Sequence, residues 1–289
     1  MKNVVPTCSG TLVNQSIREW VPRSFDDFLE ELQHLEGQFN TEDQLLIFRG
    51  HCKREWLLDS TFVRSCKVVL FGLKEHQRFS TRLVSSVNLH LALLNLFLFK
   101  FGILSHPSAE LCELEKSLGI DPWFEFMKRV QQHPDEGQDG PFCLKGTNIM
   151  DWTESSDVAL YFANCNRKGE GAVYICDATA TGNTLQVDPF GIILEKMHQE
   201  GNAGKALGVP LMFHPKRQIS NQRAKNQQAI YFAQMDLRVD LETIWREQEK
   251  GLENETIVIK LVLPSGTESQ VNDYLFSKEI TTDLLYPKS

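Results

Sequence analysis

An arginine followed by a glycine stands directly after a short apolar stretch, Leu45 to Phe48. The apolar run predicts a buried strand that ends at Gly50. There the guanidinium of Arg49 could bind a phosphate or a carboxylate through paired hydrogen bonds, and Gly50 would let the ligand approach the backbone. A surface arginine at the start of a turn fits the same residues, so this stretch alone leaves both interpretations open.

Hydroxyl and carboxyl side chains crowd the start of the stretch MDWTESSDVALYFAN, residues 150–164. The side chains that could cap a helix here are Asp151, Thr153, Ser155 and Ser156. One cap is sufficient, and the surplus hydroxyls beside Trp152 are suited to a ribose or phosphate site at the free N–H groups of a helix start. Helix capping and ligand binding are equally good interpretations.

The second half of this stretch predicts a helix over residues 156–165. Its apolar side chains recur at the spacing of one helix face, namely Val158, Tyr161, Phe162 and Cys165. This spacing favours core packing for the two aromatic rings over stacking on a ligand.

A third polar stretch, SNQRAKNQQAIYFAQ, places Arg223 four residues before Gln227. Gln227 and Gln228 precede the apolar residues of a predicted strand. Buried amide groups need hydrogen-bond partners, so these glutamines would serve either a ligand or a neighbouring loop.

The composition of the 289-residue chain is that of a globular protein, with 42% hydrophobic and 24% charged residues. The net charge of −8 disfavours a general nucleic-acid binder, because phosphate neutralisation needs clustered basic residues. A local basic rim remains a candidate surface for a nucleic-acid acceptor, formed by Lys216, Arg217, Arg223 and Lys225.

The seven cysteines are irregularly spaced and include no C-x-x-C pair. This pattern argues against a disulfide framework and a zinc site, and it suits a reducing compartment. The eight histidines show no metal-binding pair either, so we expect no metal. The first fifteen residues lack the apolar core of a signal peptide, and we therefore expect a cytoplasmic protein.

The most hydrophobic run covers residues 89–104 and includes His90, Asn95 and Lys100. A membrane-spanning helix needs about 20 apolar residues, so we expect no membrane span here. The run predicts a buried helix, or a helix that a partner covers, because so much apolar surface is rarely left in water.

The predicted helices and strands are interspersed without a regular β-α-β rhythm, which favours an α+β fold. A helix should begin at Ser24, whose side chain can cap it, and end at Gly37. Strands are predicted at residues 171–178 and 256–264, and a helix near the C-terminus follows them.

In their order along the chain, these stretches resemble the FRG domain family, named for its Phe-Arg-Gly motif. Phe48-Arg49-Gly50 is similar to the name motif, and Trp56, Leu58 and Arg64 follow at the family spacing. MDWTESSDVALYFA resembles the family's central motif, and Arg223 with Gln227, Gln228 and Phe232 resembles the next one. The resemblance implies a single domain over residues 23–289, preceded by an extension over residues 1–22 and carrying a helical insertion at about residues 67–132.

The FRG family in turn resembles ADP-ribosyltransferases in the order of its motifs, which implies a split mixed sheet with flanking helices and NAD as a substrate. By this resemblance Arg49, with Gly50 beside it, would hold an NAD phosphate or ribose. Thr153 and Ser155 would line the nicotinamide ribose next to Trp152, and Tyr161 would reach the nicotinamide. Gln227 or Gln228 would stand at the usual glutamate position, with Gln228 bonded to the ribose 2′-hydroxyl.

The function implied is an NAD-dependent ADP-ribosyltransferase-like toxin or effector that modifies a nucleic acid or a protein, in a toxin–antitoxin or phage-defence setting. The apolar helix over residues 89–104 would then be where an antitoxin or chaperone docks. A glutamine cannot accept a proton from an attacking nucleophile. Either another acid, such as Glu154 or Asp151, assists, or the acceptor is itself nucleophilic, or the fold binds NAD without transfer. The alternatives are therefore a non-catalytic nucleotide- or protein-binding sensor and an NAD glycohydrolase.

Overall fold

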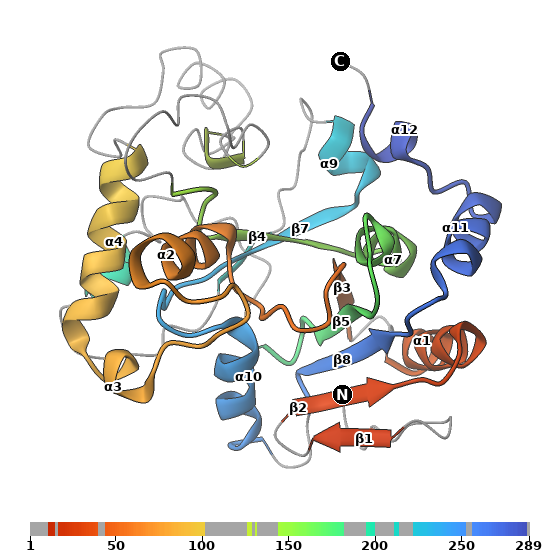
Figure 1. The fold of residues 1–289 in the computed structure, drawn as a ribbon, viewed down its shortest axis with the longest axis horizontal. Helices are drawn as coiled ribbons and strands as arrows, with labels where there is room; N and C mark the ends of the chain where they lie inside the picture. The colour runs from red at the N-terminus through yellow and green to blue at the C-terminus, as the bar shows by residue number, and fades with distance from the viewer. Residues whose placement is uncertain are drawn as a thin grey trace.

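The computed structural model describes residues 11–14, 17–39, 44–101, 126–128, 131, 144–181, 195–199, 211–213, 222–252 and 256–287. Within them the strands form one mixed sheet in the order β1-β2-β8-β5-β3-β4-β7-β6 (Figure 1). The strands are β1 (Thr11–Asn14), β2 (Ile17–Val21), β3 (Leu46–His51), β4 (Ile149–Thr153), β5 (Gly171–Asp177), β6 (Leu211–Phe213), β7 (Ala229–Ala233) and β8 (Val258–Leu263). The expected α+β fold with a mixed sheet is confirmed.

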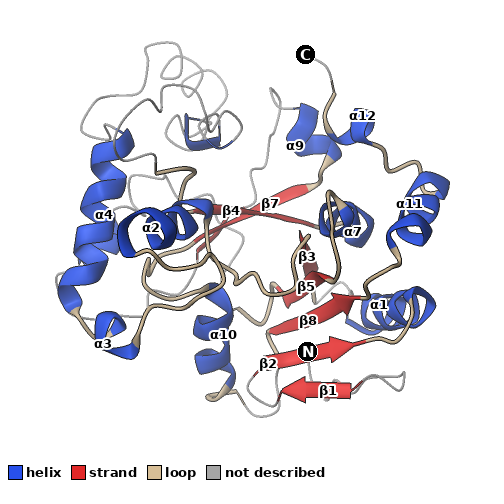
Figure 2. Cartoon of the chain, viewed as in Figure 1, coloured by secondary structure: helices blue, strands red, loops and turns tan. Residues whose placement is uncertain are grey.

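Helices cover the sheet as separate groups, which Figure 2 shows in blue. The longer helices are α1 (Phe25–Phe39), α2 (Thr61–Phe71), α4 (Val87–Phe101), α7 (Ser156–Asn164), α10 (Leu241–Glu249) and α11 (Glu268–Ser277). The short ones are α3 (Thr81–Val84), α9 (Gln222–Asn226) and α12 (Thr282–Leu285). In Figure 1 the helices α1, α7 and α11 lie together on the right, and α2, α3 and α4 lie together on the left.

The alternation of side chains along the strands explains this arrangement. On β3, Phe48 points into a core shared with α1, α7 and α11, whereas its neighbour Ile47 points into the core under α10. On β4 and β7, Ile149 and Tyr231 instead face a third core that α2 and α4 cover. Successive strand residues point to opposite faces of the sheet. On the face that carries Phe48 and Ile149, the covering helices change between β3 and β4 from α1, α7 and α11 to α2 and α4.

The pairing between neighbouring strands is shortest at this junction between β3 and β4. β3 and β4 are antiparallel and share a register pair only at Phe48 and Thr153 within the described residues, although β3 pairs with β5 along its whole length. The strands therefore part beyond that pair, on the side of Arg49 and Asp151. The eight-strand order remains continuous across this junction.

Gly50 is needed because α7 lies very close to β3. A Cβ atom on Gly50 would stand 1.9 Å from the Ala159 carbonyl oxygen and 2.5 Å from the Ala163 backbone nitrogen. The two alanines are one helical turn apart and face the strand, so they and Gly50 form a contact without side-chain bulk. The close packing of α7 accounts for the glycine at this position, and the expected approach of a ligand to Gly50 stays a prediction.

Three local expectations differ from the structure. Helix α1 starts as expected, with Asp27 N donating to Ser24 Oγ at 3.1 Å, but it continues through Gly37 to Phe39. Ile17–Val21, part of the expected N-terminal extension, form β2, which pairs in parallel with β8. Residues 149–153 form a strand rather than a helix cap, because β7 pairs with each of them.

The apolar run expected to dock a partner forms α4 within the described residues. Its side chains Leu93, Leu94 and Phe97 are buried in the protein's own core, whereas Phe99 is 88% exposed. The apolar stripe that suggested a partner is thus mostly accounted for by internal packing. Among the described residues, no helix is both long and apolar enough to cross a membrane.

A buried ion pair beneath α2 gives a prediction on stability. Lys67 Nζ lies 2.5 Å from Asp59 Oδ2, both side chains are at most 1% exposed, and Asp59 also accepts from Gln234 Nε2 at 3.2 Å. Lys67→Met leaves the Asp59 carboxylate buried without its cation, so we expect a loss of about 3 kcal/mol in the free energy of unfolding at neutral pH.

The pH dependence of this loss is a second readout. Burial already raises the pKa of Asp59, and removal of Lys67 raises it further, so the folded variant holds its proton more tightly than the unfolded chain. The stabilisation that the protonated Asp59 carboxyl gives the variant is present at low pH, and it is lost as the pH rises through the pKa of Asp59 in the folded state. Denaturant unfolding at several pH values should therefore show the smallest loss in acid, and a loss independent of pH would contradict the assignment. Adding Asp59→Asn to Lys67→Met should restore part of the stability.

Candidate functional site

A cavity of about 300 Å³ opens where β3 and β4 part. Its walls come from the end of β3 and the loop that follows it, from β4, from α7, and from the segment of α9 that leads into β7. The lining residues are Phe48, Arg49, Gly50, Cys52, Trp56, Asp151, Trp152, Thr153, Phe162, Cys165, Arg223 and Gln227. The three polar stretches found in the sequence thus meet at one cavity.

Arg49 bridges the gap between the two strands. Its Nη1 donates to the backbone carbonyl of Asp151 on β4, and its Nε donates to His51 Nε2 at 3.1 Å. Burial and the neighbouring Arg64 guanidinium lower the pKa of Arg49 to about 10. The group therefore remains a cation at neutral pH, and a second cation lies close to it.

That second cation, Arg64, stacks on the ring of Trp56, which lines the cavity. Its guanidinium carbon lies 5.1 Å from the centre of the Trp56 ring, and burial lowers its pKa. Its Nη1 is buried and has no hydrogen-bond partner among the described residues. Two neighbouring guanidinium groups, one with an unused N–H donor, favour binding of an anion such as a phosphate.

Asp151 is the one carboxylate that lines the cavity within the described chain. It is the exposed residue of a strand whose other four residues are buried, and Gln131 Nε2 donates to its Oδ2 at 2.7 Å. The surrounding protein raises the pKa of Asp151 by desolvation, whereas Arg49, Arg223 and Lys128 act to lower it. A carboxylate held among cations in a cavity is a candidate general base.

The C-terminal segment holds the remaining wall in place. Gln227 is buried, and its Nε2 donates to the Leu285 carbonyl at 3.1 Å. The Arg223 guanidinium carbon lies 4.3 Å from the centre of the Tyr286 ring, and the Phe162 ring contacts the same tyrosine edge-on at 6.5 Å. Arg223, Phe162 and Gln227 are therefore positioned by residues near the end of the chain.

The expected hydroxyl site is corrected by the hydrogen bonds. Thr153 lines the cavity, but its Oγ1 donates to the Gln227 carbonyl at 2.7 Å and accepts from Ser155 N at 3.0 Å. Ser155 is the N-cap of α7, where its Oγ accepts from Val158 N at 3.3 Å, and it does not line the cavity. Both hydroxyls therefore hold the backbone in place, and a ribose contact by Thr153, which lines the cavity, stays a prediction.

The other three expected ligand contacts differ in their position. Trp152 lines the cavity, but the residue is only 2% exposed and its ring packs edge-on against Phe232 and Trp245 in the core under α10. Tyr161 lies outside the lining and bonds Thr282 Oγ1 at 2.9 Å. Gln228 is exposed with a positive φ of 45° and also lies outside the lining.

The residues that sequence reasoning left out of the site are aromatic and acidic. Trp56 and Phe162 supply rings to the cavity, although the spacing along α7 favoured Phe162 as core. The sequence favours Asp151 as a helix cap, or as one of two acids that could assist the reaction, and does not distinguish it from Glu154. The alternation of Met150, Asp151 and Trp152 in a strand is the signal that could have placed the carboxylate on the open face.

The expected basic rim is not a single surface in the described part of the chain. Arg223 lines the cavity and stacks on Tyr286, whereas Lys225, two residues further along α9, is exposed and does not line the cavity. Lys216 and Arg217 lie outside the described residues.

Comparison with known proteins gives no match to any family model, curated protein or solved structure. The fold and the site themselves define an α+β protein with a cavity of mixed charge, rich in arginine and aromatic rings, at the junction between two strands.

Proposed function

We propose that this protein is an NAD-dependent ADP-ribosyltransferase-like effector that modifies a macromolecule. The observation that carries the proposal is the grouping of Arg49, Arg223 and Asp151 with two aromatic rings at the place where β3 and β4 part. Arginines suit a pyrophosphate, aromatic rings suit a planar base, and a carboxylate suits the charge that develops at the ribose. The resemblance of the motifs to the FRG family and to ADP-ribosyltransferases supports the same function.

The cavity suits only part of the dinucleotide. Its volume of about 300 Å³ is at the small end of ligand pockets, so it fits the nicotinamide and its ribose with the adjacent phosphate. The adenosine half would then extend outward. In this arrangement Arg49 and Arg223 bind the phosphates, and Trp56 and Phe162 flank the nicotinamide.

The reaction breaks the bond between the ribose C1′ and the nicotinamide nitrogen. Nicotinamide leaves with the bonding electron pair, and positive charge develops on the ribose as an oxocarbenium ion. The Asp151 carboxylate stabilises that charge and accepts the proton that the acceptor loses as it attacks C1′. Asp151 thereby takes the role for which Gln227 and Gln228 are unsuited, because an amide cannot accept that proton.

A nicotinamide-release assay tests this function. The purified protein is incubated with NAD alone, with RNA, with DNA and with cell lysate, and free nicotinamide is measured in each. Release that depends on an added acceptor supports a transferase, and release in buffer alone supports the NAD glycohydrolase. The absence of release in every condition would exclude both enzymes.

The non-catalytic sensor is favoured by one observation. Gln227 at the expected glutamate position is fixed through its amide to the Leu285 carbonyl, so it has no acid–base role. NAD binding without nicotinamide release would support this alternative. A cytoplasmic location and a role in toxin–antitoxin or phage-defence systems belong with the effector proposal, and growth arrest on expression, lost in Asp151→Asn, would support them.

Two cysteines provide a direct test of where NAD binds. Cys52 and Cys165 both line the cavity, and Cys165 is exposed. We expect NAD to protect Cys165 from alkylation by N-ethylmaleimide, because the bound nucleotide would cover it. Peptide mass mapping measures the modification at each thiol.

The control for this protection is the Arg49→Ala variant. We expect it to lose the protection at Cys165 while the buried Cys66 stays unmodified with and without NAD. Equal labelling of Cys165 with and without saturating NAD in the wild-type protein would place the nucleotide elsewhere.

A further inference from the structure

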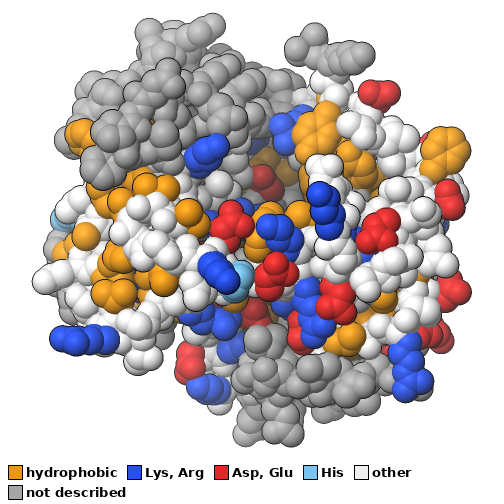
Figure 3. Space-filling model, viewed as in Figure 1, with side chains coloured by type: hydrophobic (Ala, Val, Ile, Leu, Met, Phe, Trp, Pro, Cys, Tyr) orange, Lys and Arg blue, Asp and Glu red, His pale blue; other side chains and the backbone are white. Residues whose placement is uncertain are grey.

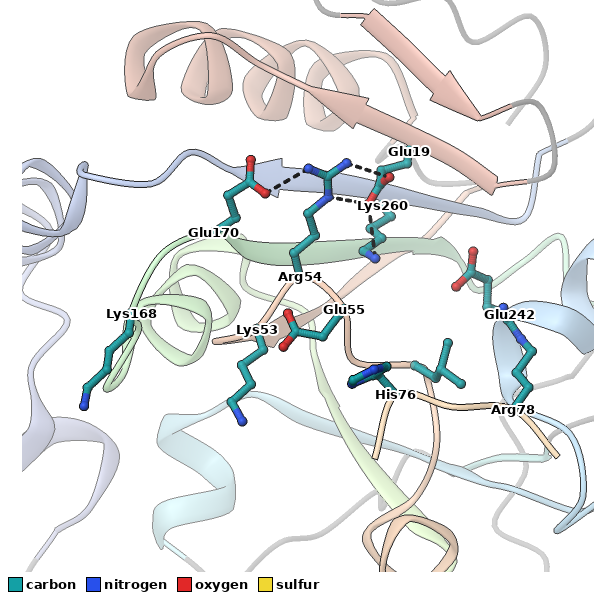
Figure 4. Close-up of a pocket in the computed structure, with 11 residues that line it drawn as sticks. Glu19, Lys53, Arg54, Glu55, His76, Arg78, Lys168, Glu170, Glu242 and Lys260 are labelled. Atoms are coloured by element: carbon teal, nitrogen blue, oxygen red, sulfur yellow. Dashed lines mark hydrogen bonds and ion pairs between the residues drawn. The ribbon is translucent and has the colours of Figure 1, made fainter. Parts of the chain in front are cut away.

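A second hollow lies across the loop that follows β3. It is a groove of about 590 Å³ lined by charged side chains, namely Glu19, Lys53, Arg54, Glu55, His76, Arg78, Lys168, Glu170, Glu242 and Lys260, together with Leu57. Figure 4 shows these residues around the groove, and Figure 3 shows basic and acidic side chains interspersed at the centre of this face. Trp56 and Cys52 line the first cavity, whereas Lys53, Arg54 and Glu55 line the groove, so the loop is a wall between the two.

A network of ion pairs forms the floor of the groove. Arg54 donates from Nε and Nη2 to the two carboxylate oxygens of Glu19 at 3.0 Å and from Nη1 to Glu170 at 2.9 Å. Lys260 Nζ lies 3.2 Å from Glu19 Oε1. These four side chains are therefore engaged with each other rather than with a ligand.

Glu242 differs from the other carboxylates that line the groove, because it is buried and, within the described part of the chain, lacks a hydrogen-bond partner at one oxygen. It is 2% exposed, and its Oε1 is buried with no hydrogen-bond partner among the described residues. In Figure 4 its carboxylate points toward the groove from α10. An unsatisfied carboxylate oxygen at such burial is costly, so a donor to Oε1 would stabilise the site. Arg246 Nε, one turn further along α10, is also buried without a hydrogen-bond partner among the described residues, and it does not bond to Glu242.

The cations around Glu242 are each bound to another acid. Arg78 Nε lies 2.9 Å from Asp240 Oδ2, Arg246 lies 3.1 Å from Glu249, and Lys260 pairs with Glu19. The helix start does not use Glu242 either, because Asp240 caps α10 by accepting from Thr243 N. Burial and the nearby Asp240 raise the pKa of Glu242, as expected for a carboxylate without a cation of its own.

We propose that this groove binds a small organic cation, with an ammonium or guanidinium group that donates to Glu242. The remaining groove volume accepts the body of that molecule above the ion-paired floor. This site is independent of the proposed NAD reaction, since none of the groove residues belongs to the first cavity.

Titration calorimetry tests the site with three probes on the full chain. Agmatine carries a guanidinium and an ammonium group, n-butylamine carries an ammonium alone, and n-pentanol is the neutral control. We expect agmatine or butylamine to bind the wild-type protein and pentanol not to bind. Because a hydrogen bond to a charged group is lost, Glu242→Gln should weaken binding by about tenfold or more, whereas Glu55→Gln, at another carboxylate of the same groove, should change it far less.

A measurement in the wild-type protein makes the test independent of how the variant folds. Carbon NMR of protein labelled at glutamate carboxyls follows the ionisation of Glu242, and a bound cation should lower the pKa of Glu242 because it favours the charged form. The proposal is overturned if neither cation binds, if the affinity is unchanged in a folded Glu242→Gln, or if the cation that binds does not shift the titration of Glu242.

Discussion

Replacement of Gly50 by alanine is expected to destabilise the protein by more than about 4 kcal/mol, beyond the usual range of single substitutions. The new Cβ would stand 1.9 Å from the Ala159 carbonyl oxygen and 2.5 Å from the Ala163 nitrogen. Both are backbone atoms of α7, so no side-chain rotation relieves the contact. The helix would have to move away from β3. Phe162 and Cys165, which form one wall of the cavity, would move with it. Chemical denaturation followed by circular dichroism measures this loss.

Gly37 provides the matched control for this substitution. It lies inside α1, and an added Cβ there meets no atom within 4 Å. Gly37→Ala should therefore stabilise the protein by about 0.5–1 kcal/mol, because alanine loses less backbone entropy in a helix. If Gly50→Ala were as stable as the wild-type protein, the close packing of α7 on β3 would be contradicted.

Replacement of Asp151 by asparagine is expected to lower the rate of nicotinamide release by about 100- to 10,000-fold, the usual contribution of a positioned acid–base group. The variant keeps the size of the side chain and its contact with Gln131, so the fold should be retained. What it removes is the one carboxylate that lines the cavity in the described chain. The thermal unfolding midpoint should change little, which separates an effect on chemistry from an effect on folding.

The pH dependence of the rate gives a second readout of Asp151. Desolvation raises the pKa of this carboxyl above 3.8, and the ionised form is the one that accepts a proton. The rate should therefore rise with pH as Asp151 ionises, and this acid limb should disappear in Asp151→Asn. A wild-type acid limb that persists unchanged in the variant would assign it to another group.

Much of the architecture could be predicted from local patterns. The apolar runs that became β3, β5, β7 and β8 are each short and rich in branched or aromatic residues, and Ser24 caps α1 as expected. The sequence did not predict strand β4, because the residues Asp-Trp-Thr are typical of a helix cap. Its strand conformation depends on pairing with β7, a contact between residues about eighty positions apart that no local pattern contains.

The site was predicted in its parts but not in its contacts. The order of the motifs predicted that Arg49, Thr153 and Gln227 lie close together, and all three line the cavity. Which atoms face the cavity depends on partners elsewhere. The Thr153 hydroxyl donates to the Gln227 carbonyl, and the Gln227 side-chain amide donates to the Leu285 carbonyl. Trp152 packs in the core under α10. These choices follow from packing and hydrogen bonding across the sheet.

We propose that Arg49 binds NAD in the cavity between β3 and β4. Calorimetric titration of NAD into the wild-type protein and into Arg49→Ala measures this contact, with Arg54→Ala as a matched arginine control on the other side of the loop. We expect NAD to bind the wild-type protein and the Arg54→Ala variant, and to bind Arg49→Ala at least about tenfold more weakly, because a charge-assisted contact to phosphate is lost. Equal affinity of NAD for the wild-type protein and for a folded Arg49→Ala, or no binding to either, would contradict the claim.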